Sequence, residues 1–265
     1  MKIGVTGSSG TLGKALLNRG AIPLDCDIKD LGRVESELDS ARPDLIIHMA
    51  CKSNVDWCEK PENQEEVIQT NVRGAYYVAL AAEDRKIPML ALSTDHIFNG
   101  RRGPYKESYR KTIPINFYGQ SKLAMETVLS AFKNVKVIRT SNVFSDDDHR
   151  MFDYMDTLAL EYPVHIPTFQ YRSFMYIEHF IDSLLLCVQK FYEIPNLLHI
   201  SGSKTVSWYD FFVAFYGQSS LINKKKRDDK GFVPRPKKAG LNTELSKKLG
   251  FPQYDYLDGI KEMKK

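Results

Sequence analysis

The stretch TGSSGTLG, residues 6–13, restricts the possible folds more than any other part of the chain. It places Gly7, Gly10 and Gly13 at intervals of three, between the apolar run KIGV and a segment with helical character. In such a turn the first glycine allows the tight bend, the second lets a pyrophosphate approach the backbone, and the third lets helix and strand pack closely. Amide groups at the helix N-terminus then face the phosphates, where the helix dipole favours negative charge. The turn therefore predicts a dinucleotide site, whose contacts we assign to Gly7, Ser9, Gly10, Thr11, Leu12 and Gly13.

The rest of the chain alternates strands with helices. Apolar runs typical of buried strands, PDLIIHMA, MLALSTD and VKVIRT, are separated by longer segments with apolar residues at helical spacing. Such alternation is typical of crossover units, which build a parallel sheet covered by helices on both faces. We expect an α/β fold with a doubly wound parallel (Rossmann) sheet and a smaller C-terminal substrate-binding lobe. Residues 1–145 form the dinucleotide-binding domain in this prediction, elements near 175–202 return to it, and residues 146–265 mainly form the smaller lobe.

The second strand of a dinucleotide fold usually ends in an acidic residue that binds the adenosine ribose. Asp25, at the end of AIPLD, is the candidate, but it follows the glycine turn after an unusually short crossover. Asp25 can equally lie in a loop, leaving room for a 2′-phosphate near Lys14 or Arg19. The choice between NAD and NADP therefore stays open. Asp27 and Ile28 are expected to border the adenine, with a solvent-facing turn an equal interpretation of Asp27.

The stretch FYGQSK places Tyr118 and Lys122 one helical turn apart, on the same face of a helix. Upstream, the strand LALSTD ends at Thr94. In a doubly wound sheet both segments reach the edge where ligands bind. The three residue types suit hydride transfer to a carbonyl carbon, because the carbonyl oxygen gains negative charge and needs a proton. Tyr118 would donate that proton and Thr94 would hold the oxygen by a hydrogen bond.

The lysine has a chemical reason to lie beside the tyrosine. A free phenol has a pKa of about 10, and bringing it to neutrality corresponds to roughly 4 kcal/mol. A nearby cation in a partly dehydrated cleft lowers the pKa of a phenol. Lys122, together with the positive nicotinamide of the oxidised cofactor, is expected to act in this way on Tyr118 and to anchor the nicotinamide ribose. Taken alone, Tyr-x-x-x-Lys is equally an exposed helix pair; the glycine turn and STD weigh against that reading.

Several motifs together resemble the extended short-chain dehydrogenase/reductases, and within them the dTDP-4-dehydrorhamnose reductase group. They are TGSSGTLG, HMACKSNVDWCEKP, TNVRGAYYVA, LALSTDHIFNG, PINFYGQSKLAMET and VIRTSNVF, which together span about the first 145 residues. The resemblance implies catalytic roles for Thr94, Tyr118 and Lys122. It also implies that Ala50 and Lys52 line the nicotinamide ribose. Asn71 of TNVRG is either a scaffold residue or a cofactor-side residue.

The second half resembles the family in outline only. Nucleotide-sugar enzymes of this class carry an R-x-F-x-Y segment and an RP pair, and RSFMYI and RPKK give Arg172 and Arg235 as expected ligands of a substrate diphosphate. His96 stands where the reductase group usually has tyrosine, and Asn142 where it commonly has tryptophan. These two departures, and YRSFMY in place of a Gly-Ser-Pro-Thr type segment, are expected to face the sugar. We assign Asp95 to the substrate side as well.

The resemblance implies an NADPH- or NADH-dependent reductase that reduces the 4-keto group of a dTDP- or UDP-linked 4-dehydro-6-deoxyhexose, in deoxysugar (rhamnose-type) biosynthesis. One alternative is a nucleotide-sugar epimerase, or a bifunctional 3,5-epimerase/4-reductase, with Cys51, Lys52 or His96 as the base. Dehydratases of the class need an acid pair after the threonine, and His96 after Asp95 argues against that reaction. A third possibility is a non-catalytic NADP-binding regulatory subunit like that of methionine adenosyltransferase.

Composition excludes several other classes. A net charge of +4 with interleaved acidic and basic residues favours no nucleic-acid partner, and no apolar run is long enough to span a membrane. The N-terminus does not resemble a signal peptide. Four cysteines without metal-type spacing favour reduced thiols in a cytoplasmic protein, and the DDDH run at Asp146–His149 favours a solvated loop over a metal site. A nucleotide sugar is the expected partner, and a homodimer is possible.

Overall fold

A computed structural model describes residues 1–145, 162–226 and 233–264 of the chain; the DDDH run lies outside these residues. Its centre is a six-stranded sheet in the order β10-β5-β4-β3-β1-β2, in which every neighbouring pair is parallel. This confirms the predicted α/β fold with a doubly wound parallel sheet. The strands are β1 (Ile3–Thr6), β2 (Ile22–Pro23), β3 (Leu45–His48), β4 (Met89–Thr94), β5 (Val135–Thr140) and β10 (Leu197–His199).

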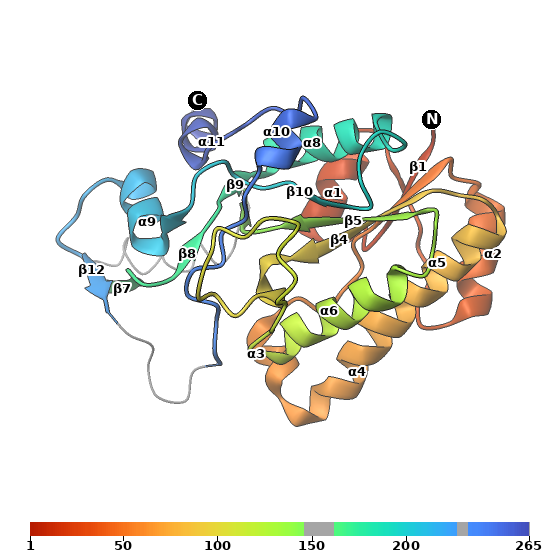
Figure 1. The fold of residues 1–265 in the computed structure, drawn as a ribbon, viewed down its shortest axis with the longest axis horizontal. Coiled ribbons are helices and arrows are strands. Elements are labelled where there is room, and N and C mark those ends of the chain that lie inside the picture. Colours follow the sequence, from red (N-terminus) through yellow and green to blue (C-terminus); the bar gives the residue numbers. More distant parts are fainter. Residues whose placement is uncertain (146–161, 227–232, 265) are drawn as a thin grey trace.

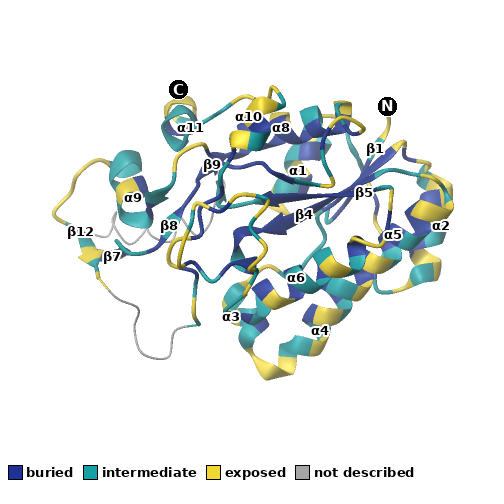
Figure 2. Ribbon diagram, viewed as in Figure 1, coloured by how far each residue is buried: buried dark blue, intermediate teal, exposed yellow. Residues whose placement is uncertain are grey.

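Helices cover both faces of the sheet (Figure 1). One face carries α1 (Thr11–Asn18) and α8 (Ile177–Gln189), and the other carries α2 (Leu31–Ala41), α5 (Ala75–Asp84) and α6 (Phe117–Leu129). Strand β3 serves both layers because successive side chains of a strand point to opposite faces. Leu45 and Ile47 belong to the cluster that contains α1 and α8, and Ile46 belongs to the cluster that contains α2, α5 and α6. The strands are consequently buried from both sides (Figure 2).

The strand order creates a crevice beside β1. Strands β2 and β3 pair with opposite edges of β1, so the chain reverses its direction of winding there. Ligands of open α/β sheets bind outside the carboxyl ends of the strands at such a point. The residues that follow β1, β3, β4 and β5 all lie at this end, since Thr6 is in register with His48 and Thr94 with Thr140.

Besides the main sheet, the described residues form three two-stranded sheets and an aromatic cluster, in which the rings of Phe174 and Phe211 stack at 4.1 Å. Strand β10 and helix α8 come from the same half of the chain but join the main sheet. The lobe boundary near residue 145 stays a prediction. The other elements are α3 (Val55–Glu59), η1 (Pro61–Asn63), α4 (Gln64–Ile68), the π-helix η2 (Gln69–Gly74), η3 (Asp95–Ile97), β6 (Val143–Phe144), β7 (Val164–Pro167), β8 (Tyr171–Arg172), β9 (Met175–Tyr176), β11 (Val206–Ser207), α9 (Trp208–Tyr216), β12 (Ile222–Lys225), α10 (Glu244–Lys248) and α11 (Tyr256–Met263).

The described residues contain no helix that is both long and apolar enough to cross a lipid bilayer. The four cysteines are free thiols, with Cys58 and Cys187 buried and Cys26 and Cys51 partly exposed.

Candidate active site

A cavity of about 650 Å³ lies at the carboxyl ends of the sheet strands. Its walls come from the glycine turn and the start of α1, from the segments that follow β3, β4 and β5, and from α6. The structure thus brings most of the predicted site residues to one place, and their individual roles stay predictions. Those that line the cavity are Gly7, Ser9, Gly10, Thr11, Leu12, Gly13, Ala50, Thr94, Asp95, His96, Tyr118, Lys122 and Asn142.

The three glycines of the turn have different surroundings. Gly7 has a φ of 72°, and a Cβ added there would lie 2.7 Å from the Ala50 nitrogen. A Cβ on Gly13 would lie 2.4 Å from the Gly7 carbonyl oxygen, because helix α1 starts directly against the turn. Gly10 has room, since its nearest neighbour would be 3.5 Å away. Two of the glycines therefore serve the packing of the turn, and Gly10 leaves open the space that a pyrophosphate would need.

We expect Gly13→Ala to lower the free energy of unfolding by about 1–3 kcal/mol, because the methyl group would overlap backbone atoms that cannot move aside freely. Gly10→Ala is the matched control: its methyl group has space, so stability stays within about 0.5 kcal/mol of the parent protein while dinucleotide affinity falls. Urea unfolding and a dinucleotide titration of both variants check this. Equal stability of the two variants would contradict the packing argument.

Tyr118 is a partly buried phenol that keeps its proton at neutral pH. Burial is the largest cause that raises the pKa of Tyr118, and Cys51 raises it further, while a hydrogen bond with Thr94 acts in the opposite direction. Lys122 is not among the groups that most affect this pKa. In the protein alone, the expected acidification of the phenol by Lys122 is therefore outweighed by burial, and the phenol is available as a proton donor.

Lys122 is 3% exposed and its ammonium group lies 2.9 Å from Met125 Sδ. Burial lowers the pKa of Lys122, whereas Cys51 and Glu126 raise it. The amine lies one helical turn beyond Tyr118 and also faces the cavity. Its place suits a contact with a polar group of a bound ligand, which would replace the weak contact to sulfur.

Asn71 is a scaffold residue in this structure. Its fully buried side chain accepts a hydrogen bond from Lys52 N at 2.7 Å and donates to Lys52 O at 3.0 Å and to Ser121 Oγ at 2.9 Å. Ser121 in turn donates to the Tyr118 carbonyl oxygen at 2.7 Å. Asn71 thus ties the loop after β3 to helix α6. It lies in η2, and π-helical turns often occur at functional sites.

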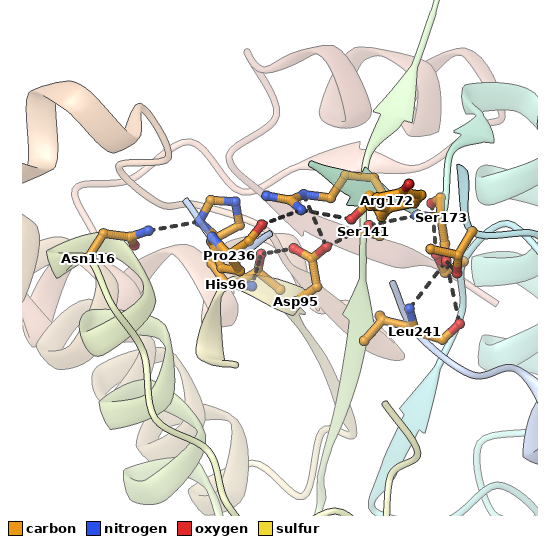
Figure 3. A network of polar contacts seen from close by, with 12 residues as sticks. Asp95, His96, Asn116, Ser141, Arg172, Ser173, Pro236 and Leu241 are labelled. Atoms are coloured by element: carbon orange, nitrogen blue, oxygen red, sulfur yellow. Dashed lines mark hydrogen bonds and ion pairs between the residues drawn. The ribbon is translucent and has the colours of Figure 1, made fainter. Parts of the chain in front are cut away.

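Asp95, which lines the cavity, forms a buried ion pair with Arg172 (Figure 3). Both side chains are 2% exposed, and Arg172 Nε lies 3.6 Å from Asp95 Oδ2. Ser141 Oγ donates to the same carboxylate oxygen at 2.6 Å. Arg172 Nη1 donates to the carbonyl oxygens of Tyr171 and Pro236, at 2.8 and 2.7 Å. Burial raises the pKa of Asp95, and the guanidinium and the Ser141 hydroxyl act against that rise.

The contacts of Arg172 and Arg235 with a substrate diphosphate stay a prediction. Neither is among the described residues that line the cavity. Arg172 is held by Asp95 and by backbone carbonyl groups. Arg235 donates to both carboxylate oxygens of Asp56, at 2.9 and 2.6 Å, and to the carbonyl oxygen of Val233. Each guanidinium is therefore already paired with a carboxylate of the chain.

The contacts expected at the adenosine end also stay a prediction. Strand β2 ends at Pro23, so Asp25 lies beyond it as an exposed loop residue. Asp27 is exposed and accepts a hydrogen bond from the backbone of the following turn. Ile28 is 5% exposed and packs in the core, close to Gly74. None of these three lines the cavity.

Lys52 and Arg19, two cations that the sequence placed near the cofactor, each pair with a carboxylate of the chain. Lys52 does not line the cavity, and its Nζ pairs with Glu66 at 3.4 Å. Arg19, one of the two candidates for a 2′-phosphate, pairs with Glu178 at 2.5 Å and with Asp182 at 2.9 Å. A long, flexible side chain pairs with a carboxylate that is near it in space. The sequence pattern does not show which carboxylate that is.

Sequence reasoning did not identify Asn116 and Ser141. Asn116 caps helix α6, since its Oδ1 accepts a hydrogen bond from Gly119 N at 2.8 Å. An asparagine directly before a helix is a local signal that could have revealed it. Ser141 has no such signal, because its partner Asp95 lies 46 residues away in the chain.

The sheet order, the glycine turn and the helix with Tyr118 and Lys122 define the class of extended short-chain dehydrogenase/reductase proteins. Comparison with known families agrees with this class and confirms the resemblance that the motifs indicated. The chain belongs to the family described as the RmlD substrate binding domain, which it matches over residues 1–265.

Individual relatives cover most of the chain. It is 27% identical over 277 residues to the spore coat polysaccharide biosynthesis protein SpsK of Bacillus subtilis, covering 98% of this chain and 96% of that protein. It is 30% identical over 232 residues to the dTDP-4-dehydrorhamnose reductase of Aggregatibacter actinomycetemcomitans, covering 81% and 78%. The crystal structure of dTDP-4-dehydrorhamnose reductase from Bacillus anthracis in complex with NADP matches with a TM-score of 0.88, at 23% identity and 99% coverage of both chains. This last likeness supports the fold.

Proposed function

We propose that the protein reduces the 4-keto group of a nucleotide-linked 4-dehydro-6-deoxyhexose, with NADPH as the reductant, in deoxysugar biosynthesis. One observation carries this proposal: Thr94, Tyr118 and Lys122 line the same cavity as the glycine turn. The named activity of the reductases that the chain resembles supports the choice of substrate class. A cytoplasmic location, a homodimer and a substrate-binding role for the smaller lobe stay predictions.

The residues present suit a dinucleotide. The open space at Gly10 and the start of helix α1, which faces the cavity at Thr11 and Leu12, would hold its pyrophosphate. Ala50 and Lys122 would border the nicotinamide end. When bound, NADPH supplies the hydride. Asp25 is exposed and does not line the cavity, so its carboxylate leaves room for the 2′-phosphate of NADPH.

The chain's own part in the reaction is to hold the carbonyl and to deliver a proton. Thr94 and Tyr118 both line the cavity and bring two hydroxyl groups to it. The Tyr118 O–H bond breaks as the oxygen of the reduced carbonyl takes the proton, which leaves a hydroxyl group on the sugar and a phenolate on the enzyme. A protonated Lys122 nearby favours that phenolate. Solvent then returns the proton to Tyr118.

The test follows the absorbance of NADPH with dTDP-4-dehydrorhamnose and, separately, with its UDP-linked counterpart. We expect the amount of NADPH oxidised to equal the amount of sugar reduced. We also expect the KM for NADPH to be lower than the KM for NADH. Exchange of sugar C–H protons with deuterated water, without oxidation of NADPH, would identify an epimerase instead. Tight binding of NADPH without either reaction would identify a regulatory binding protein.

A further inference from the structure

His96 borders the place where Tyr118 acts. It lies in the short helix η3, directly after the end of strand β4, and its half-buried ring lines the cavity. The imidazole and the Tyr118 ring meet edge to face, with centroids 5.6 Å apart and an angle of 69° between the planes. A ligand that reaches the Tyr118 hydroxyl therefore also approaches the imidazole.

The orientation of the Asn116 side chain can be deduced from two contacts that do not involve His96. Asn116 Oδ1 accepts a hydrogen bond from Gly119 N at 2.8 Å as the cap of helix α6. Asn116 Nδ2 donates to the Pro234 carbonyl oxygen at 2.9 Å. If the amide were rotated by about 180°, its oxygen would face the Pro234 carbonyl oxygen and its NH₂ group would face the Gly119 N–H. Both contacts therefore require the same orientation of the amide.

The same amide fixes the tautomer of His96. Asn116 Nδ2 lies 3.2 Å from His96 Nδ1, a contact drawn as a dashed line in Figure 3, so its second hydrogen is directed to this ring nitrogen. Since the amide nitrogen only donates, Nδ1 must carry the lone pair, and a neutral imidazole then has its hydrogen on Nε2. Within the part of the chain that the structure describes, the hydrogen-bond network of His96 gives Nε2–H no acceptor.

The surroundings of His96 also keep its ring neutral. Burial lowers the pKa of His96 to about 3, and the positive charges of Arg172 and Arg235 act in the same direction. The other ionisable groups beside it are Tyr118, a neutral phenol, and Asp95, whose charge is balanced by Arg172. The folded-state pKa lies below the pH range of ordinary measurements, so the ring neither gains nor loses a proton there.

We propose that His96 is a specificity-determining residue whose Nε2–H donates a hydrogen bond to a sugar oxygen next to the carbonyl that is reduced. This rests on the proposed function. His96 holds the substrate in this account and does not act as an acid or a base, so it does not serve as the base of a C3 or C5 epimerisation. Asn116 acts through it as a positioning residue, because its amide decides which imidazole nitrogen carries the hydrogen.

The tautomer can be tested without any substrate. Nitrogen NMR of histidine-labelled protein distinguishes an imidazole nitrogen that carries hydrogen from one that carries a lone pair. We expect one histidine, absent from the spectrum of His96→Gln, to show hydrogen on Nε2 only and no titration between about pH 6 and pH 9. Hydrogen on Nδ1, or a titration in this range, overturns the proposal whether or not the protein is a reductase.

Kinetics with the 4-keto nucleotide sugar test the contact itself. His96→Leu removes the donor, and we expect the KM for the sugar to rise about tenfold while kcat changes less than about twofold, because a binding contact is lost. His96→Gln keeps an N–H donor and is expected to restore most of the loss. His165→Leu, which changes an exposed side chain of strand β7, is the matched control. An unchanged KM in His96→Leu overturns the proposal, and so does a fall in kcat at unchanged KM.

Asn116→Asp reverses the tautomer. The aspartate keeps the helix cap but offers an acceptor to Nδ1, so Nε2 loses its hydrogen unless the ring is protonated. We expect a raised KM at high pH that falls as the pH drops and the imidazolium forms, a pH dependence that the parent protein lacks. A KM that is independent of pH in this variant contradicts the role given to Asn116. If the parent protein shows no turnover at all, the proposed function fails, and the NMR result still decides the tautomer.

Discussion

Replacing Tyr118 with phenylalanine is expected to lower kcat by about 10²–10⁴-fold, while NADPH still binds. The change removes one oxygen atom and with it the proton that the reduced carbonyl requires. Because burial raises the pKa of Tyr118, the parent enzyme holds this proton throughout the neutral range, so its loss cannot be compensated by raising or lowering the pH. Steady-state rates of NADPH oxidation, with dinucleotide binding measured separately by fluorescence, check both parts of the prediction.

The matched control for this variant is Tyr192→Phe, since Tyr192 is 87% exposed and its hydroxyl has no part in the cavity. Its kcat should equal that of the parent protein. Near-full activity of the Tyr118 variant in an active enzyme would mean that another group delivers the proton. Thr94, the other hydroxyl at this position in the cavity, would then be the first candidate.

Replacing Arg172 with alanine is expected to lower the free energy of unfolding by about 3–5 kcal/mol. The change leaves the Asp95 carboxylate buried without its cation and removes the donor to the Tyr171 and Pro236 carbonyl groups. The loss should grow with pH. Burial already raises the pKa of Asp95, so folding favours its protonated form, and stability falls as the pH rises above the pKa of an unfolded aspartate, about 3.9. Without Arg172 the pKa of Asp95 rises further, which extends this fall to higher pH.

Urea unfolding at several pH values measures this loss, and a double-mutant cycle with Asp95→Asn separates the ion pair from the other contacts of Arg172. We expect the double variant to be more stable than the sum of the two single changes, because neither partner is then left charged and alone. A loss in Arg172→Ala that does not depend on pH would show that the carbonyl contacts, and not the charge of Asp95, dominate.

The sequence predicted the parts of the site that short-range geometry determines. The glycine turn, the strand that ends at Thr94 and the helical spacing of Tyr118 and Lys122 are local patterns, and a parallel sheet brings strand ends together at one edge. The structure confirms the sheet and places these residues along one cavity. Their chemical roles rest on the proposal.

The arginines could not be assigned in the same way. Arg235 pairs with Asp56, which is 179 residues away, and Arg172 of strand β8 pairs with Asp95 at the start of η3. A guanidinium takes the nearest acceptor in space, and no sequence spacing reports that distance. Asp25 lies in a loop, one of the two placements that the sequence left open, because strand β2 is only two residues long and ends at Pro23.

The sheet also limits how such a protein can be divided. Strand β10 pairs with β5 at one edge, and helix α8 packs on α1, although both come from residues after 175. A fragment cut near residue 145 would leave β5 with an open row of amide and carbonyl groups, which promotes aggregation. During synthesis, that row stays unpaired until residue 199 has left the ribosome. An engineer who exchanges sugar-binding regions between such proteins must therefore graft around α8 and β10 and keep both with the N-terminal half.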